Sequence, residues 1–185
     1  MSFPTTDPVI ADTRRWLERA VIGLNLCPFA KAVHVRQQVH FAVCASPAFA
    51  DVLQALDDEL EALLGLPASE RDTTLLMLPE GFDEFLLFQQ LVADGERRLA
   101  RRGLEGTVQL ANFHPAFRFA QAEDDDPGNN SNRAPYPTLH LLREDSIDRA
   151  VAAMPDAEAI FGANIERLRQ LGPAGWAALD VGRFG

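Results

Sequence analysis

The sequence predicts a layered α/β domain, with an α+β arrangement as the alternative. Helical and strand patterns alternate along the 185 residues, and such chains usually fold around a mostly parallel sheet. Apolar residues make up 47% of the chain and charged residues 24%, as in ordinary globular proteins. One core suffices at this length, so we expect residues 1–185 to form a single domain, with about three to five strands flanked by helices.

Five segments have the apolar periodicity of amphipathic helices. They cover about residues 8–25, 48–64, 82–102, 146–153 and 157–171. Asp7 and Asp156 precede the first and the last of these helices as N-caps. Gly65, Gly103 and Gly172 follow three of them as stop signals.

Three segments predict strands, at residues 33–44, 75–78 and 108–113. In the first, Val39 and Phe41 alternate with His40, which is typical of a half-buried strand, or of two strands if the chain turns at Gln37. The second is a short, continuous apolar run and predicts a buried strand.

Two segments fit neither pattern. One is the turn at residues 26–31, and the other runs from residue 115 to about 137 around an acidic, asparagine-rich centre. A structureless loop longer than ~12–15 residues is usually functional or disordered. These two segments are therefore the places where we expect chemistry.

Charge and cysteine content narrow the class of protein. Lys and Arg number 17 against 27 Asp and Glu, for a net charge of −10, which disfavours nucleic acid and anionic membrane surfaces as partners. No apolar run reaches the ~18 residues of a membrane span, and the first residues lack the features of a signal peptide. Two cysteines without a CxxC motif favour a reducing cytoplasm.

Cys27 is the first candidate catalytic residue. Pro28 favours the start of a helical turn, which would make Cys27 its N-cap, with Lys31 on the same side. Backbone N–H groups and a nearby cation both favour the nucleophilic thiolate. The structural alternative is a small buried residue that packs a corner.

His114 is the second candidate. Asn112 and His114 share a face at the carboxyl end of the third predicted strand, where open α/β sheets bind ligands. The structural alternative is a histidine that hydrogen-bonds to loop backbone and holds the strand exit.

His140 and Glu144 form the third candidate group. If a helix begins at Pro137, these residues lie at i and i+4 on one face, as a metal-binding or acid–base pair. If the segment is a strand, they lie ~13 Å apart and cannot share one ion. The structural alternative is a surface network of Arg143 and Glu144 beside a partly buried His140.

These candidates coincide with three motifs that resemble an uncharacterised bacterial family, domain of unknown function 1415. The motifs are Leu-Asn-Leu-Cys-Pro-Phe-Ala-Lys at 24–31, Asn-Phe-His-Pro at 112–115 and Asn-Arg-Ala-Pro-Tyr-Pro-Thr-Leu-His-Leu-Leu-Arg-Glu at 132–144. The resemblance implies no reaction, but it marks these segments as the family's signature. Ala134 stands where we expect serine, which argues against an essential hydroxyl there.

The leading hypothesis is a small cytoplasmic enzyme, similar to a hydrolase or transferase, that acts on a small polar or anionic molecule. Its pocket would lie where the 26–31 turn, the 112–115 strand end and the 124–144 loop converge, with Cys27 as nucleophile or redox thiol and His114 or His140 as general base. The predicted substrate-binding residues are Lys31, Asn112, Asn132, Arg133, Tyr136 and Arg143.

Two alternatives stay open. In a metal-dependent enzyme, His114, His140 and Glu144 or a loop aspartate would bind zinc or iron as a two-His-one-carboxylate site. In a non-catalytic protein, the signature segments would form a rigid platform for a ligand or a partner, with a homodimer as one version.

Overall fold

The computed structural model describes residues 7–154 and 159–183 and contains a four-stranded sheet in the order β1-β2-β4-β3. The strands are β1 (Val39–Val43), β2 (Thr73–Met77), β3 (Val108–Phe113) and β4 (Thr138–Arg143). β1 and β2 are parallel, and β4 is antiparallel to both β2 and β3. The sheet is therefore mixed, because β4 lies between two strands that run the other way. The predicted α/β class is confirmed.

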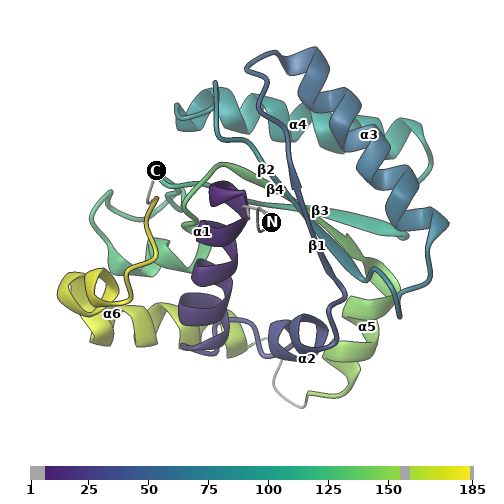
Figure 1. The fold of residues 1–185 in the computed structure, drawn as a ribbon. Coiled ribbons are helices and arrows are strands. Elements are labelled where there is room, and N and C mark those ends of the chain that lie inside the picture. The colour runs from purple at the N-terminus through teal and green to yellow at the C-terminus, as the bar shows by residue number, and fades with distance from the viewer. Residues whose placement is uncertain (1–6, 155–158, 184–185) are drawn as a thin grey trace, which may run out of the picture.

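Helices cover both faces of the sheet. They are α1 (Pro8–Trp16), the π-helix η1 (Leu17–Ile22), α2 (Ala30–Val35), α3 (Phe49–Gly65), α4 (Phe85–Arg101), the 3₁₀ helix η2 (Pro127–Asn132), α5 (Glu144–Ala152) and α6 (Ile160–Ala178). α3 and α4 lie together on one side of the sheet, and α1, α2 and α6 lie on the other (Figure 1). Among the described residues, no helix combines the length and apolar character that crossing a bilayer requires.

The main core lies between the sheet and the α3–α4 layer. Leu76, Leu139 and Leu141 from the sheet pack against leucines of α3 and against Phe88 and Leu91 of α4, and all of these are essentially fully buried. Each such side chain contributes about 1.5–3 kcal/mol. The regular leucine spacing of α3 and α4 explains why both helices form close to where the sequence predicts them.

A second core lies on the other face. Trp16 of α1 packs edge-on against Phe113 of β3, with ring centroids 5.0 Å apart, and Ala134 and Val181 complete the cluster. Asp7 caps α1 as predicted, because its Oδ1 accepts the Val9 N–H at 2.8 Å. α1 continues into η1, which ends three residues before the expected limit.

The first predicted strand is wrong in its first half. Residues 30–35 form α2, and Gln37 then adopts the left-handed conformation (φ 59°), so that β1 begins only at Val39. The alternation of Val33 and Val35 with polar residues is typical of a half-buried strand. Val35 is nevertheless 71% exposed, so the alternation does not mark a buried face. A helix this short carries too little periodicity to be recognised.

The expected N-cap position of Cys27 is also wrong. α2 begins at Ala30 rather than at Pro28, and no side chain caps it. The Cys27 carbonyl accepts the Ala30 N–H at 3.2 Å, which closes a turn before the helix.

The long segment after β3 is a folded loop held by its own polar side chains. Asn129, fully buried, accepts the Phe119 N–H at 3.1 Å and donates to the Glu123 carbonyl at 2.8 Å. Asp126 caps η2 and pairs with Arg169 of α6 at 2.6 Å, and this pairing lowers the pKa of Asp126 to about 2. The acidic, asparagine-rich composition therefore serves loop structure.

α6 breaks where the sequence predicts a stop and then resumes. Gly172 has φ 68° and ψ 177°, outside helical geometry, and Pro173 starts a second helical segment that runs to Ala178. The predicted N-cap Asp156 lies outside the described residues. The second segment carries Trp176, which the sequence analysis did not single out.

Candidate functional site

An apolar pocket of about 380 Å³ lies against the face of the sheet that α3 and α4 leave free. η1 and α2 form one wall, α5 forms another, and β1, β2, β3 and β4 all contribute to the floor. Most lining side chains are apolar, among them Leu17, Val21, Phe29, Val39, Phe113 and Ile147. Pockets of this size and character commonly hold small molecules.

The wall formed by η1 has unusual backbone geometry. π-helical turns are rare and are frequent at functional sites, and Leu17 and Val21 of this one face the pocket. After η1 the chain turns through Asn25, which has a left-handed conformation (φ 51°). A strained turn next to a pocket is typical of functional sites.

His140 is the main polar group in the pocket floor. β4 places it between Leu75 of β2 and Ala111 of β3. Its Nε2 lies 2.7 Å from Oγ1 of Thr73, whose single hydroxyl proton is donated to the Leu141 carbonyl, also at 2.7 Å. Because a carbonyl cannot donate, Nε2 of His140 must supply the proton in its bond to Thr73. Its Nδ1 is then the unprotonated nitrogen.

Nδ1 of His140 is open to the pocket. Burial lowers the pKa of His140 to about 4, so the ring is neutral at physiological pH. In the described part of the chain no hydrogen bond reaches Nδ1, and no fully buried side-chain nitrogen or oxygen lacks a partner. Solvent in the pocket therefore reaches Nδ1, which can accept a hydrogen bond or a proton.

Cys27 lines the same pocket as His140, so the structure brings two of the three predicted catalytic residues together. Both are partly exposed, and within the described residues no hydrogen bond joins them. Lys31 is exposed on α2 outside the pocket lining.

His114 lies on the opposite side of the sheet from this pocket. It is fully buried, and its ring packs 5.2 and 5.1 Å from the rings of Phe85 and Phe88. Nε2 donates to the Phe82 carbonyl and Nδ1 accepts the Ala116 N–H, both at 2.9 Å. Burial lowers the pKa of His114, partly opposed by the bond to Phe82.

The structure therefore does not bring His114 and Cys27 together. Asn112 also faces the α4 side, where its Oδ1 accepts a hydrogen bond from Gln89 at 3.2 Å. Both ring nitrogens of His114 hold backbone, as the structural alternative for this residue expected.

Arg143 and Asn132, two of the predicted substrate-binding residues, both bond to backbone groups. Arg143 borders the apolar pocket, but its guanidinium donates to the carbonyls of Leu63, Leu66 and Arg71. The Asn132 carbonyl accepts the His114 N–H at 3.1 Å.

Tyr136 is buried, and its hydroxyl donates to Asp12 at 2.8 Å. Burial and this bond raise the pKa of Tyr136 to about 12. Tyr136 therefore stays protonated and anchors the loop to α1.

The proposed metal ligands are not assembled. His114 and His140 face opposite sides of the sheet, and Glu144 begins α5 after the end of β4. Across the described ranges, no group of three or more His, Cys, Asp or Glu side chains is placed to hold an ion.

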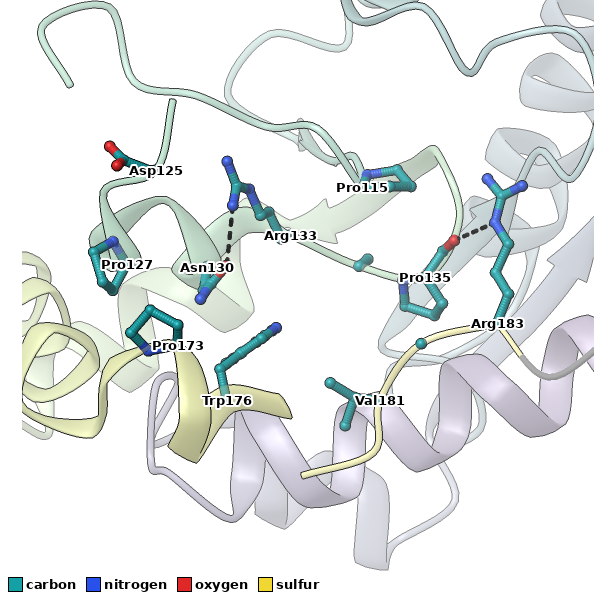
Figure 2. Close-up of a pocket in the computed structure, with 12 residues that line it drawn as sticks. Pro115, Asp125, Pro127, Asn130, Arg133, Pro135, Pro173, Trp176, Val181 and Arg183 are labelled. Atoms are coloured by element: carbon teal, nitrogen blue, oxygen red, sulfur yellow. Dashed lines mark hydrogen bonds between the residues drawn. The ribbon is translucent and has the colours of Figure 1, made fainter. Parts of the chain in front are cut away.

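A second, open pocket of about 470 Å³ lies between the loop after β3 and the C-terminal segment (Figure 2). Arg133 is fixed there by bonds to the carbonyls of Phe117 (3.0 Å) and Asp124 (2.8 Å), and Asn130 lies beside it. The predicted single site is thus divided, with Cys27 and His140 in one pocket and Arg133 in the other. The two pockets share no lining residue.

Sequence reasoning missed Thr73 and Trp176. Thr73 fixes the tautomer of His140 only because β2 and β4 are adjacent, and nothing in the sequence shows that pairing. Trp176 follows the predicted helix stop at Gly172, so its position past the break was not considered.

Fold and pockets together define an α/β protein with a small-molecule-sized apolar pocket. The chain belongs to the family described as "Protein of unknown function (DUF1415)", whose model matches residues 8–178. This confirms the resemblance carried by the three signature motifs. Searches of curated proteins and of solved structures gave no significant match.

Proposed function

We propose that the protein binds a small, largely apolar molecule in the pocket between η1 and the sheet. The observation that carries the proposal is the neutral His140 ring, whose Nδ1 makes no hydrogen bond within the described residues and faces a largely apolar cavity of about 380 Å³. A ligand that enters the pocket displaces the solvent from Nδ1, and a donor group on the ligand replaces the hydrogen bond that the solvent made there. An alcohol, a phenol or an amine N–H supplies such a donor.

The pocket lining supports an apolar ligand over the polar or anionic one expected from the sequence. A charged molecule would have to lose its hydration among side chains such as Leu17, Val21 and Phe113. Arg143 borders the pocket and donates to three backbone carbonyls, but the apolar majority of the lining favours an uncharged ligand.

The test uses N-phenyl-1-naphthylamine, a neutral apolar fluorophore with one N–H donor. We expect its fluorescence to rise saturably with the wild-type protein. Ala30→Phe should weaken binding about tenfold or more, because Ala30 lines the pocket and a phenyl ring there occupies its volume. Ala32→Phe is the matched control, since Ala32 is exposed on the same helix, and should leave the affinity unchanged.

Equal affinity of wild type and Ala30→Phe would place the dye elsewhere and overturn the proposal. Ala150→Phe fills the same pocket from α5 and serves if Ala30→Phe does not fold. Circular dichroism of each variant establishes that the fold is intact.

A second candidate function is thiol-dependent catalysis in the same pocket, favoured by the presence of both Cys27 and His140 in its lining. In this version Cys27 Sγ bonds to an acyl carbon of the substrate while its proton passes to Nδ1 of His140. The proton then goes to the leaving group as the bond to the acyl carbon breaks. Water, or an acceptor nucleophile in a transferase, next attacks the acyl carbon and gives its proton to Nδ1, which passes it to Sγ as the carbon–sulfur bond breaks. The enzyme would be similar to a hydrolase or transferase and would work in the bacterial cytoplasm, which the free thiols of Cys27 and Cys44 support.

The thiol proposal is tested by alkylation with N-ethylmaleimide, resolved by peptide mass, with Cys44 as internal control. We expect Cys27 to react in the folded protein and to be protected by N-phenyl-1-naphthylamine, while Cys44 is not protected, because Cys44 packs against the α3–α4 core instead. If Cys27 reacts only after unfolding, the thiol is part of the core and this candidate is wrong.

A further inference from the structure

The open pocket of Figure 2 has walls of restricted conformation. Pro115 and Pro135 come from either end of the loop after β3, Pro127 starts η2, and Pro173 starts the second segment of α6. The Trp176 indole projects from that segment, with its ring nitrogen directed toward the space between Arg133 and Val181 (Figure 2). Proline fixes one backbone torsion, so these walls are set before any ligand arrives.

Arg133 is the charged group of this pocket that has no carboxylate partner. Its Nε and Nη2 donate to backbone carbonyls and its Nη1 to Asn130 Oδ1 at 3.4 Å, so every acceptor it meets is neutral. Within the described residues it forms no ion pair. By contrast, Arg183 on the same pocket pairs with Asp83 at 2.8 Å.

Partial burial makes the unpaired charge costly. Burial lowers the pKa of the Arg133 guanidinium, and the Asp124 carboxylate raises it in part. Asp124 itself is paired with Arg118 at 2.5 Å and is largely exposed. A partly desolvated cation without a counter-ion attracts an anion, and the remaining N–H groups of a guanidinium fit a carboxylate.

Two further donors face the pocket without partners. Nε1 of Trp176 and Nδ2 of Asn130 make no hydrogen bond within the described part of the chain, and neither is fully enclosed. Three side chains of the lining, one of them charged, therefore carry hydrogen-bond donors. Asp125 lines the rim, where its carboxylate points away from the centre in Figure 2 and disfavours a second negative charge on the ligand.

We propose that this pocket binds a small organic monocarboxylate, with its carboxylate on Arg133 and its apolar part against Trp176 and the proline walls. This site is separate from the apolar pocket and does not depend on the function proposed for it. The ligand class follows from the single unpaired cation, the donor set and the ring-lined walls.

The test follows the two tryptophan indole N–H signals in proton–nitrogen correlation spectra, assigned with Trp176→Phe. Benzoate should shift the Trp176 signal saturably. Benzyl alcohol keeps the phenyl ring but lacks the charge, and its affinity should be lower than that of benzoate by about tenfold or more. Arg133→Gln should weaken benzoate about tenfold. Arg118→Gln removes an equal charge from the same loop, outside the pocket lining, and should leave the affinity within about twofold.

Three results would overturn the proposal: no saturable shift, equal binding of benzoate and benzyl alcohol, or equal loss in Arg118→Gln and Arg133→Gln. If Arg133→Gln loses the native spectrum, Trp176→Phe decides instead. It keeps an aromatic ring, though a smaller one, and removes the N–H donor, so benzoate, followed at the backbone amide of Gly182 in the pocket lining, should bind several-fold more weakly. Unchanged affinity in that variant would likewise overturn the proposal.

Discussion

At the scale of single residues, His140 links the pocket to pH. Its pKa is lowered to about 4 in the folded protein, while an unfolded histidine titrates near its ordinary value of about 6.5. Between these values the unfolded chain binds a proton that the folded protein does not. The stability that comes from keeping His140 neutral is therefore fully present above pH ~6.5, and it is lost as the pH falls toward ~4.

We predict that His140→Gln makes the free energy of unfolding less dependent on pH in this window. The difference in pH-induced change between wild type and variant should be about 3 kcal/mol, measured by urea unfolding at several pH values. His114, whose pKa is also lowered, is present in both proteins, so the comparison isolates His140. Parallel pH curves for the two proteins would contradict the assignment.

The sequence predicted which residues deserve study but not what each one does. Cys27 was predicted as an N-cap and His140 as a partner of Glu144, both within signature motifs, and both residues line one pocket. His114 also lies in a signature motif. Its two ring nitrogens, however, bond to backbone groups of Phe82, in a loop, and of Ala116, two residues further along the chain. Hydrogen bonds to backbone carry no residue signature, so sequence reasoning cannot separate the two histidines.

At the scale of elements, predictions succeeded where apolar periodicity is long. α3 and α4 carry several turns of leucine and phenylalanine spacing, and both were predicted to within a few residues. α2 has only six residues, and its alternating valines match a strand equally well. The loop after β3 has no period at all, because Asn129 and Asp126 shape it through hydrogen bonds and an ion pair.

The end of α3 is held to β4 by one side chain. Arg143 donates to the carbonyls of Leu63 and Leu66, at the carboxyl end of the helix, and to that of Arg71. We predict that Arg143→Lys lowers the free energy of unfolding by about 1–3 kcal/mol, because an ammonium lacks the planar fork that reaches several carbonyls. Chemical denaturation measures this loss.

The matched control for this prediction is Arg149→Lys. Arg149 is exposed on α5 and pairs with Asp145 one turn away. Its replacement should change stability by less than about 0.5 kcal/mol. If both variants lose the same amount, the carbonyl contacts of Arg143 contribute little beyond charge.

At the scale of the whole molecule, the layered α/β class followed from the order of elements, whereas the strand order did not. β4 is inserted antiparallel between β2 and β3. This places His140 beside Thr73, on the face of the sheet opposite α3 and α4. Local patterns do not encode which strands become neighbours.

The two pockets lie on either side of the second core. Trp16 and Val21 of that core face the apolar pocket, while Ala134 and Val181 face the open one. A close-packed core with no second arrangement transmits little coupling between sites. We predict that saturating benzoate changes the affinity for N-phenyl-1-naphthylamine by less than about twofold, and that Arg133→Gln leaves the dye affinity equally unaffected.

Titrating the dye with and without benzoate measures the coupling, and the reverse titration checks it, because linkage requires the same factor in both directions. A reciprocal change well above twofold would mean that the core between the pockets has two arrangements. Trp16 and Val181 belong to one cluster and face opposite pockets. The packing of these two side chains would then differ between the two arrangements. A mutual decrease in affinity that keeps growing with ligand concentration, without reaching a limit, would instead indicate that benzoate and the dye compete for one pocket.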